Sequence, residues 1–304
     1  MKQPLVSVVI TCYNYADYVE QAIKSILQQT YKNIELIIID DGSTDKSLDI
    51  ITKYRDSAKI VSRKNKGIVY TRNEAIQLAK GRYLCFLDAD DYFDQDFIGN
   101  MVDIAEQTKA DVVYPNWRIF GDRDEKIKFP EFDVQKLIKH EIHCTAESLI
   151  RVEAIGDSRF ENEVVAEDWD FFLGLALKGK RFVSAKNCFI NYRIRQNTRG
   201  SSRNYWDDMR YFYEILHKWQ KKYPKVVNPI DLPLAVGQKR DEFIDEQKKL
   251  IDSLQATVDT LKKETTLQRQ SIIDLNNAIK NIQESKAYQL STKLSAIKHR
   301  IKKS

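Results

Sequence analysis

Three aspartates follow directly behind a short apolar run. Residues 83–87 are mostly apolar, and the chain continues with Asp88, Ala89, Asp90 and Asp91. Carboxylates at this spacing repel one another unless a cation lies among them. Oxygen ligands favour Mg²⁺ or Mn²⁺, which commonly binds one or two carboxylates together with substrate phosphates and so neutralises a leaving diphosphate. The alternative interpretation is structural, with Asp90 or Asp91 capping the next helix.

Polar groups also follow other apolar segments at the points where strands are expected to end. They are Thr11, Cys12, Tyr13 and Asn14; Asp40, Asp41, Gly42, Ser43 and Thr44; and Lys66, Gly67, Arg72 and Asn73. Open parallel sheets bind ligands at the carboxyl ends of their strands. Aromatic, carboxylate and cationic groups at one such edge suit a ligand with a base, a ribose and phosphates. For the Asp-Asp-Gly segment an ordinary turn remains the alternative.

The elements that must position these groups alternate between strand and helix. The patterns predict strands at residues 5–12, 34–39, 59–62, 83–87 and 111–114, with helices after Asp17 and at 48–54, 69–80 and 97–107. Such alternation indicates βαβ units in a doubly wound parallel sheet. After Pro115 the pattern breaks into short mixed segments, and residues 169–177 and 205–223 are expected to be helical, with 188–194 a strand.

Together these motifs resemble the signature set of family 2 glycosyltransferases, over about residues 4–195. The set comprises Thr11, Tyr13 and Asn14, the Asp40-Asp41-Gly42-Ser43 turn, Lys66-Gly67, Arg72-Asn73 and Asp88-Ala89-Asp90. The resemblance implies the GT-A fold, a Rossmann-like α/β architecture with a mostly parallel sheet and helices on both faces. It also implies a nucleotide-sugar donor.

The resemblance to the family implies roles for individual residues of this chain. Tyr13 and Asp41 would contact the nucleobase or ribose, assisted by the main chain near Thr11, and Arg72 would lie near the diphosphate or base. Asp88 and Asp90 would be the DXD pair, with Asp90 the closer metal ligand. The remaining residues expected in the nucleotide-sugar site are Asn14, Lys66, Gly67 and Ala89.

Glu167-Asp168-Trp169 resembles the family's ED motif and precedes a predicted helix. Most members invert the anomeric centre, which needs a base to take the acceptor's proton, and Asp168 is the candidate. A helix N-terminus stabilises an ionised carboxylate. The alternative is that Asp168 is only an N-cap. Trp169 could stack on an acceptor sugar ring or pack in the core, and the core position is favoured.

Other patterns carry less weight. Tyr192, Arg193 and Arg195 loosely resemble the family's basic segment near the diphosphate. His140 and His143 lack an apparent third metal ligand, so packing or surface roles are favoured. Residues 174–180 match GxxxxGK but lie in and after a predicted helix, so we interpret this match as coincidence.

A heptad repeat runs through residues 244–282. Its seam is Ile244, Gln247, Ile251, Leu254, Val258, Leu261, Thr265, Gln268, Ile272, Leu275, Ile279 and Ile282. β-Branched residues at every first position, with Leu254, Leu261 and Leu275 among the second positions, favour a parallel dimer over a trimer. We therefore predict self-association through a coiled coil. A single long helix packed on the catalytic part is the alternative.

The net charge of +5 comes from the tail. Residues 286–304 contain five Lys and one Arg without an acidic residue, and they form a short basic amphipathic pattern. Such a tail could contact an anionic membrane surface or be a solvated helix end, and both interpretations remain open. Nucleic acid binding is not expected, because the rest of the chain is close to neutral.

The 304 residues lack a membrane-spanning run and a signal-peptide pattern, so we expect a cytoplasmic protein, with contact at the inner face of the membrane as an option. The four cysteines are dispersed and are expected to be buried thiols.

The predicted division of the chain is a GT-A domain at 1–222, a proline-marked linker at 223–237, a coiled-coil stalk at 238–285 and the basic tail at 286–304. The predicted function is inverting transfer from a UDP- or dTDP-sugar, with UDP favoured, to a glycan, glycolipid or glycoprotein hydroxyl, including a lipid-linked acceptor. The alternative is a catalytically silent coiled-coil scaffold of a glycan-assembly complex.

Overall fold

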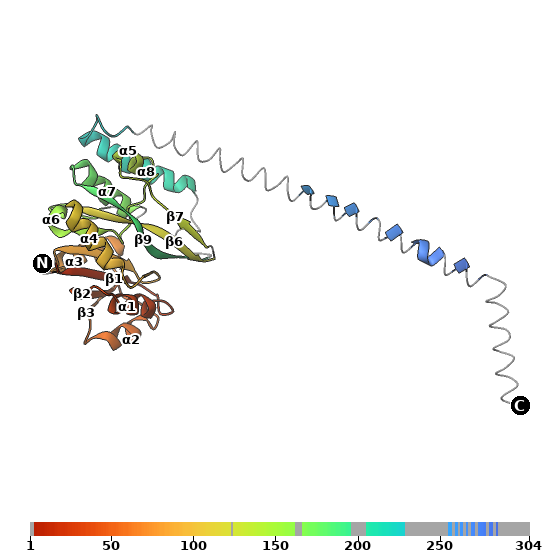
Figure 1. Ribbon diagram of the computed structural model, residues 1–304, viewed down its shortest axis with the longest axis horizontal. Coiled ribbons are helices and arrows are strands. Elements are labelled where there is room, and N and C mark those ends of the chain that lie inside the picture. The colour runs from red at the N-terminus through yellow and green to blue at the C-terminus, as the bar shows by residue number, and fades with distance from the viewer. Residues whose placement is uncertain are drawn as a thin grey trace, which may run out of the picture. The chain divides into compact units, whose positions relative to one another are not determined.

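The computed structural model describes residues 3–228, except 123, 162–165 and 196–204, together with separate helical positions between residues 255 and 284. Side chains are described from residue 212 onward in the last helix before residue 228. The chain divides into two units, Met1–Val236 and Gly237–Ser304. The first unit contains a mixed sheet with helices packed on it (Figure 1). The predicted domain boundaries stay predictions.

The first half alternates strand and helix. In chain order it contains β1 (Val6–Cys12), α1 (Val19–Leu27), β2 (Ile34–Asp40), α2 (Ser47–Ile51), the 3₁₀ helix η1 (Thr52–Tyr54), β3 (Lys59–Ser62), α3 (Ile68–Leu78), β4 (Tyr83–Asp88), β5 (Tyr92–Phe93) and α4 (Phe97–Thr108). Strands β3, β2, β1 and β4 are neighbours and all pair in parallel. This part confirms the expected βαβ pattern.

The second half is less regular. It contains β6 (Val112–Gly121), β7 (Glu125–Ile127), α5 (Val134–Ile138), β8 (Leu149–Arg151), α6 (Val152–Ile155), α7 (Glu167–Leu177), β9 (Phe182–Ile194) and α8 (Tyr205–Lys222). The strands of the described chain form one sheet in the order β3-β2-β1-β4-β8-β6-β9-β5, with β7 beside β6. Strand β8 pairs antiparallel with both β4 and β6, and β5 and β7 are also antiparallel to their neighbours. The longest pairing of this half, between β6 and β9, is parallel, so the sheet is mixed rather than purely parallel.

Strand β6 corrects the expected break at Pro115. The strand continues to Gly121 beside β9, and the register shifts between Pro115 and Asn116. Proline cannot donate to a ladder, and a bulge accommodates it within a strand. The Asn116 side-chain amide donates to the carbonyl oxygens of Ala185 and Lys186 at this bulge, at 3.3 and 2.8 Å, so it bridges the irregular step.

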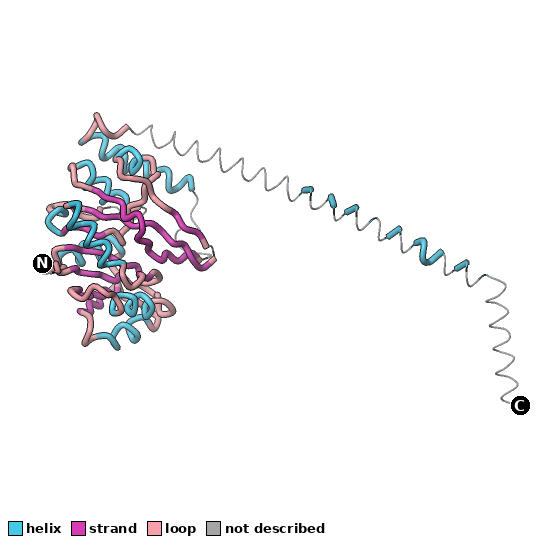
Figure 2. The backbone as a smooth tube through the Cα atoms, viewed as in Figure 1, coloured by secondary structure: helices cyan, strands magenta, loops and turns pink. Residues whose placement is uncertain are grey.

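Two apolar clusters cover the two faces of the sheet. The tube drawing shows the helices beside the strands of the first unit (Figure 2). Alternate strand residues divide between the two clusters, because neighbouring side chains in a strand point to opposite faces. Val9, Ile37 and Ile39 pack in the cluster that includes α3, α7 and α8 residues. Val8, Ile10 and Ile38 pack in the cluster with α1 and α4 residues. Helices therefore lie on both faces, as expected.

Helix α8 is fixed on α7 by a buried polar contact. Asp170 is buried and accepts hydrogen bonds from the Trp219 indole nitrogen and from Lys218 Nζ, both at 2.6 Å. The Trp219 ring lies against Gly174, where an added Cβ would come within 2.7 Å of ring carbon Cζ2. Gly174 therefore has a packing role, and the GxxxxGK match indeed begins inside a helix.

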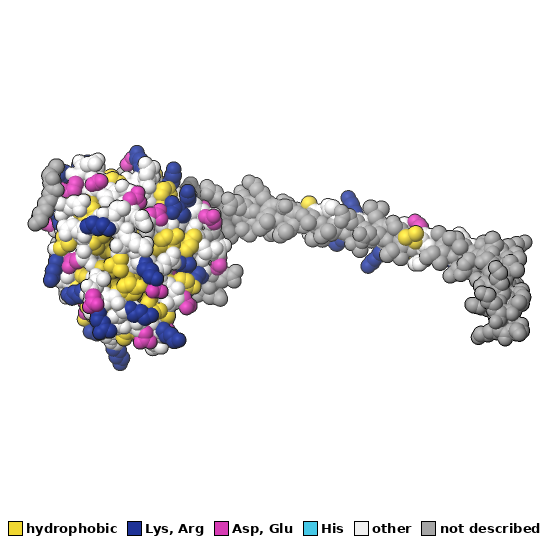
Figure 3. All heavy atoms as spheres, turned by 60° about the horizontal axis from the view of Figure 1, so that its bottom comes forward, with side chains coloured by type: hydrophobic (Ala, Val, Ile, Leu, Met, Phe, Trp, Pro, Cys, Tyr) yellow, Lys and Arg dark blue, Asp and Glu magenta, His cyan; other side chains and the backbone are white. Residues whose placement is uncertain are grey.

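The described helices and one face of the first unit show how apolar and charged residues are distributed. None of the described helices combines the length and apolar character needed to cross a membrane. On the face of the first unit drawn in Figure 3, basic and acidic side chains are interspersed. This face lacks the single-sign basic field that nucleic acid binding uses.

We expect Gly174→Ala to lower the free energy of unfolding by about 1–3 kcal/mol, because the new methyl group must displace the Trp219 ring. Gly99→Ala on α4 is the matched control, since its Cβ would have neighbours only at 3.9 Å or more and alanine is the better helix former. Urea unfolding of both variants measures the difference. Equal stability of the two variants would show that α8 does not depend on this contact.

Candidate active site

Three carboxylates gather where β4 ends. Asp88 is the last residue of β4, pairs with Thr11 of β1 and accepts a 3.0 Å hydrogen bond from the Thr11 hydroxyl. Asp90 accepts one from Arg195 Nη2 at 3.1 Å, and Asp91 accepts one from the main-chain nitrogen of Arg193 at 2.7 Å. Helix α4 begins later and its N-cap residue is Asp96. The capping interpretation of Asp90 and Asp91 is therefore wrong.

Negative charge accumulates in this region. Burial and then the charge of Asp88 raise the pKa of Asp90, while burial followed by Glu147 and Asp90 raises the pKa of Asp91. Glu147 lies in the loop before β8, and burial and then Asp88 raise its pKa as well. Each of these acids makes ionisation of its neighbours more costly. A cation at this place would relieve that cost.

A buried arginine links these acids to the ED motif. Arg72 is 4% exposed, and it donates from Nη1 to Glu167 Oε1 at 2.7 Å and from Nη2 to Asp88 Oδ1 at 3.4 Å. Burial by itself would lower the pKa of Arg72. The negative charges of Asp88 and then Glu167 raise this pKa by more than burial lowers it, so the net shift is upward. The structure thus places Arg72 inside the protein between two acids. Sequence reasoning did not predict this bridging position.

Asp41 holds the loop that leads into α3. Its carboxylate accepts hydrogen bonds from the main-chain nitrogens of Lys66 and Gly67, at 2.8 and 2.9 Å, and from Arg63. Asp40 accepts from the Ser62 hydroxyl at 3.0 Å and from the Ser43 main chain at 3.3 Å. The structure therefore brings the Asp41, Lys66 and Gly67 positions together, although they are far apart in sequence.

The loop after β1 lies beside the loop after β2. The side-chain oxygen Oδ1 of Asn14 accepts a hydrogen bond from the Thr44 main-chain nitrogen at 2.7 Å. The main-chain nitrogen of Asn14 donates to the Ser43 hydroxyl at 2.9 Å. Tyr13 is 44% exposed beside this junction, and Ala89 is fully buried between Asp88 and Asp90. Lys66 is exposed, with its ammonium 4.2 Å from the centre of the Tyr70 ring. Asn14 thus connects two loops, while Tyr13 is open to a ligand.

The end of β9 supplies two arginines. Arg193 Nε donates to the Asp90 carbonyl at 2.8 Å, and the Arg193 and Arg195 guanidinium carbons lie 4.6 and 4.3 Å from the centre of the Tyr18 ring. The basic segment noted in the sequence therefore contacts the Asp90 region. These arginines place positive charge beside the carboxylates of the β4 loop.

Asp168 is the second residue of α7. The N-cap residue is Ala166, with a positive φ of 56°, so the N-cap interpretation of Asp168 is wrong. Burial and then the charge of Glu167 raise the pKa of Asp168 to about 6, against the lowering effects of Arg72 and of the Trp169 N–H at 2.7 Å. Asp88 also raises it, which places the two acids within electrostatic reach. A carboxyl group with this pKa can exchange a proton near neutral pH.

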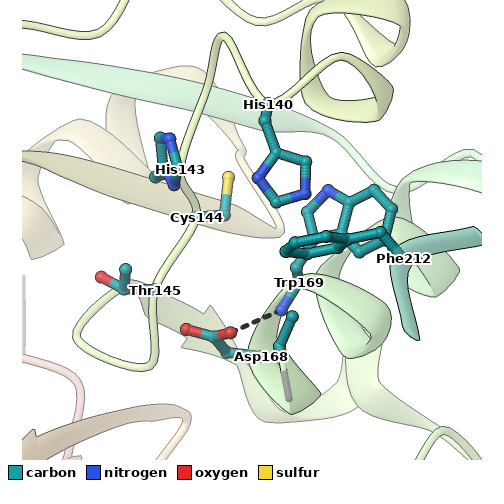
Figure 4. Close-up of a pocket in the computed structure, with 8 residues that line it drawn as sticks. His140, His143, Cys144, Thr145, Asp168, Trp169 and Phe212 are labelled. Carbon is teal, nitrogen blue, oxygen red and sulfur yellow. Dashed lines mark hydrogen bonds between the residues drawn. The ribbon is translucent and has the colours of Figure 1, made fainter. Parts of the chain in front are cut away.

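Asp168 lines a pocket of about 210 Å³ (Figure 4). The rest of its lining comes from the loop before β8, the start of α7 and Phe212 of α8, and it includes His140, His143 and Trp169. Trp169 is buried and donates its indole N–H to the Leu137 carbonyl at 2.8 Å, which confirms its core position. The two histidines pack against aromatic rings.

Two contributors escaped sequence reasoning. Arg63 follows β3 directly, so its place at a strand end was a usable signal. Glu147 had no such signal, because a lone acid before a three-residue antiparallel strand matches no motif. In the described part of the chain, no three His, Cys, Asp or Glu side chains are arranged to hold a metal ion by themselves.

Comparison with known proteins identifies the class. The family model described as glycosyl transferase family 2 matches residues 7–157. The enzyme named UDP-Glc:alpha-D-GlcNAc-diphosphoundecaprenol beta-1,3-glucosyltransferase WfaP of Escherichia coli is 38% identical over 196 residues, covering 62% of this chain and 77% of that protein.

Two solved structures show the same fold. S. aureus TarS residues 1–349 in complex with UDP-GlcNAc has a TM-score of 0.59 at 22% identity, and the match covers 70% of this chain and 66% of that chain. The mannosyltransferase PcManGT of Pyrobaculum calidifontis, in complex with GDP-Man and Mn²⁺, has a TM-score of 0.59 at 17% identity, covering 78% and 70%.

The chain belongs to glycosyltransferase family 2 and has the GT-A fold. It is a glycosyltransferase that moves a sugar from a nucleotide-sugar.

The raised pKa of Asp168 predicts a pH dependence. A base must be deprotonated, so kcat/KM for the acceptor should rise with pH and level off above an apparent pKa of about 6. Glu167→Gln removes the neighbouring negative charge that raises this pKa, so its profile should shift to lower pH. Initial rates across about pH 5 to 8 measure both curves. A flat wild-type profile, or a Glu167→Gln shift to higher pH, would contradict this assignment.

Proposed function

We propose that the chain is an inverting glycosyltransferase in which Asp168 is the base. The observation that carries the proposal is the Asp168 carboxyl group, which has a pKa of about 6 and lines a pocket while Arg72 joins its neighbour Glu167 to Asp88. A displacement with inversion requires a base for the acceptor close to the groups that bind the sugar donor. Here these groups are Asp168 and the acids at the end of β4.

In this mechanism Asp168 accepts the proton of an acceptor hydroxyl. The hydroxyl oxygen forms a bond to the anomeric carbon as the bond from that carbon to the nucleotide diphosphate breaks on the opposite side. The bonding electron pair leaves with the diphosphate. The N-terminus of α7 favours the ionised form of Asp168 before the reaction, and burial makes the carboxylate a stronger base than an exposed aspartate.

A divalent ion, Mn²⁺ or Mg²⁺, fits Asp88 and Asp90. These side chains can offer oxygen ligands. Burial and then the charge of Asp88 raise the pKa of Asp90, and a cation would offset that charge. Two protein carboxylates completed by substrate phosphates are a common arrangement for Mg²⁺, so a three-residue cluster is not required. When bound, the ion supplies electrostatic stabilisation of the leaving diphosphate. Arg193 and Arg195 are placed to share that task.

UDP is the favoured nucleotide, ahead of dTDP. Both the E. coli relative and the TarS complex carry UDP-sugars in their names. The exposed Tyr13 ring and the Asp41 carboxylate are the groups we assign to the base or ribose, with Thr11 and the Lys66-Gly67 segment nearby. Asn14 and Ala89 support these loops through the contacts and burial already described.

The acceptor we propose is a glycan hydroxyl on a lipid-linked or polymeric carrier in cell-surface polysaccharide synthesis. The name of the E. coli relative gives an alpha-D-GlcNAc-diphosphoundecaprenol acceptor for that protein. We propose a cytoplasmic location with peripheral membrane contact through residues 286–304, which lie outside the described residues. The scaffold alternative has no specific observation in its favour. A catalytically silent domain would have no need for Asp88, Asp90 and Asp168.

Nucleotide release across a sugar-nucleotide panel tests the proposed chemistry. Release with Mn²⁺ should depend on one UDP-sugar, fall to background with EDTA, and fall at least about 100-fold in Asp168→Asn, since a general base contributes about 10² to 10⁴ in rate. Asp49→Asn, an exposed acid in the first turn of α2, is the matched control and should retain full activity. Full activity of Asp168→Asn would remove the base assignment.

The coiled coil is a second proposal about the same chain. Most of its seam lies outside the described residues. Its one described member, Leu275, is helical and 63% exposed, as a seam residue is before a partner helix covers it. The dimer stays favoured over the trimer.

Light scattering should give the full chain a dimer mass and a chain ending at Val236 a monomer mass. Leu275→Lys places a charge in the seam and should weaken the dimer. Ile273→Lys lies off the seam and is the control. Identical masses for the full and shortened chains would exclude the coiled coil as the source of association.

A further inference from the structure

The pocket beside Asp168 has a wall made of three rings. The His140 and Trp169 ring centres are 4.5 Å apart, those of His140 and Phe212 are 4.4 Å apart, and those of Trp169 and Phe212 are 5.3 Å apart. Figure 4 shows the His140 ring beside the rings of Trp169 and Phe212, with the Asp168 carboxylate below them. One pocket thus combines aromatic surface with one carboxylate.

The wall is held in place by surrounding contacts. The Leu137 carbonyl accepts hydrogen bonds from the Trp169 indole at 2.8 Å and from the His140 main chain at 3.2 Å. His140 has a φ of 58°, a left-handed conformation that is uncommon for residues other than glycine. Strained backbone of this kind persists only where the surroundings enforce it, and it is often found at ligand sites.

The position of Phe212 depends on how α8 is anchored. Asp170 of α7 binds Trp219 and Lys218 of α8, and Gln135 of α5 donates to the Val226 carbonyl just after α8 at 2.8 Å. Three helices from separate parts of the chain therefore build one rigid wall. A preformed wall lowers the ordering cost of binding.

A pyranose ring suits this chemistry. It has an apolar face of C–H groups, which carry partial positive charge and are attracted to the negative face of an aromatic ring, and a rim of hydroxyls that can reach a carboxylate. Pockets for drug-sized ligands are about 300–1,000 Å³, and this one is about 210 Å³. The volume fits one sugar ring rather than an oligosaccharide.

We propose that this pocket is the acceptor subsite for a single terminal pyranose, which packs against the partly exposed His140 and Phe212 rings with one hydroxyl at Asp168, while the buried Trp169 ring supports them from behind. The proposal rests on the proposed function of Asp168 and deepens it. The enzyme then recognises the last sugar of its acceptor, while further sugars or a lipid carrier lie outside the pocket. His140 and Phe212 are specificity-determining residues.

The test uses the full chain, its active sugar-nucleotide and a panel of p-nitrophenyl pyranosides as acceptor probes. Acceptor-stimulated nucleotide release gives the acceptor and donor KM separately. Phe212→Ala and His140→Ala should each raise the KM of the stimulating glycoside about tenfold while the donor KM changes less than about twofold. Phe212→Leu keeps an apolar side chain but loses the ring, and its acceptor KM should also rise.

Tyr213→Ala is the matched control, because Tyr213 is the next residue on α8 but is 51% exposed. Its acceptor KM should match that of the wild type. The proposal is overturned if the acceptor KM is unchanged in the Phe212 and His140 variants, or if Tyr213→Ala raises it equally. It is also overturned if only oligosaccharide glycosides, and none with a single ring, stimulate release.

A binding measurement separates this proposal from the proposed function. Saturation-transfer NMR with the same p-nitrophenyl pyranosides needs no catalysis. Signals on the ring C–H protons that vanish in Phe212→Ala but persist in Tyr213→Ala support the subsite even if nucleotide release fails with every donor. Equal signals in both variants overturn the subsite even if Asp168 is the base.

Discussion

The buried guanidinium of Arg72 is the interaction on which the rest of the site depends. It joins Asp88, at the end of a central strand, to Glu167, in the first turn of a helix almost eighty residues later. Buried carboxylates without a counter-charge are costly, and removing one partner of a buried ion pair commonly costs about 3–5 kcal/mol. The arginine therefore brings the donor-side acids and the ED motif together despite their mutual repulsion.

The acids around Arg72 share one electrostatic pattern. Burial, followed by the charge of a neighbouring acid, raises the pKa of Asp90, Asp91 and Glu147. Burial and then Glu167 raise the pKa of Asp168, while Arg72 lowers it. The same fold thus supplies acids suited to a cation and an acid suited to proton transfer, through their surroundings alone.

The sequence predicted those parts that depend on local patterns. Strand β3 and the alternation up to α4 follow from apolar periodicity, and the acids after β4 follow from the rule that ligands bind at strand ends. Long-range pairing escaped prediction. Nothing local shows that β8 runs antiparallel between β4 and β6, or that a bulge lets β6 pass Pro115.

The same limit applies to the site. The motif predicted the importance of Arg72, but its position between Asp88 and Glu167 is a tertiary property. Glu147 and the ring of Phe212 were also missed, because each reaches the site from a segment without a motif of its own. The residues that we assign to the reacting groups follow from motifs, while those that build the electrostatic and aromatic surroundings required the fold.

A crystal structure of the full chain with UDP and Mn²⁺, with anomalous data collected at the manganese edge, tests the central claim most directly. The account predicts an anomalous peak beside Asp88 and Asp90, Arg72 still paired with Glu167, and Asp168 facing the same edge of the sheet. A peak elsewhere in the protein, or Asp168 turned away from that edge with Arg72 unpaired, would contradict it.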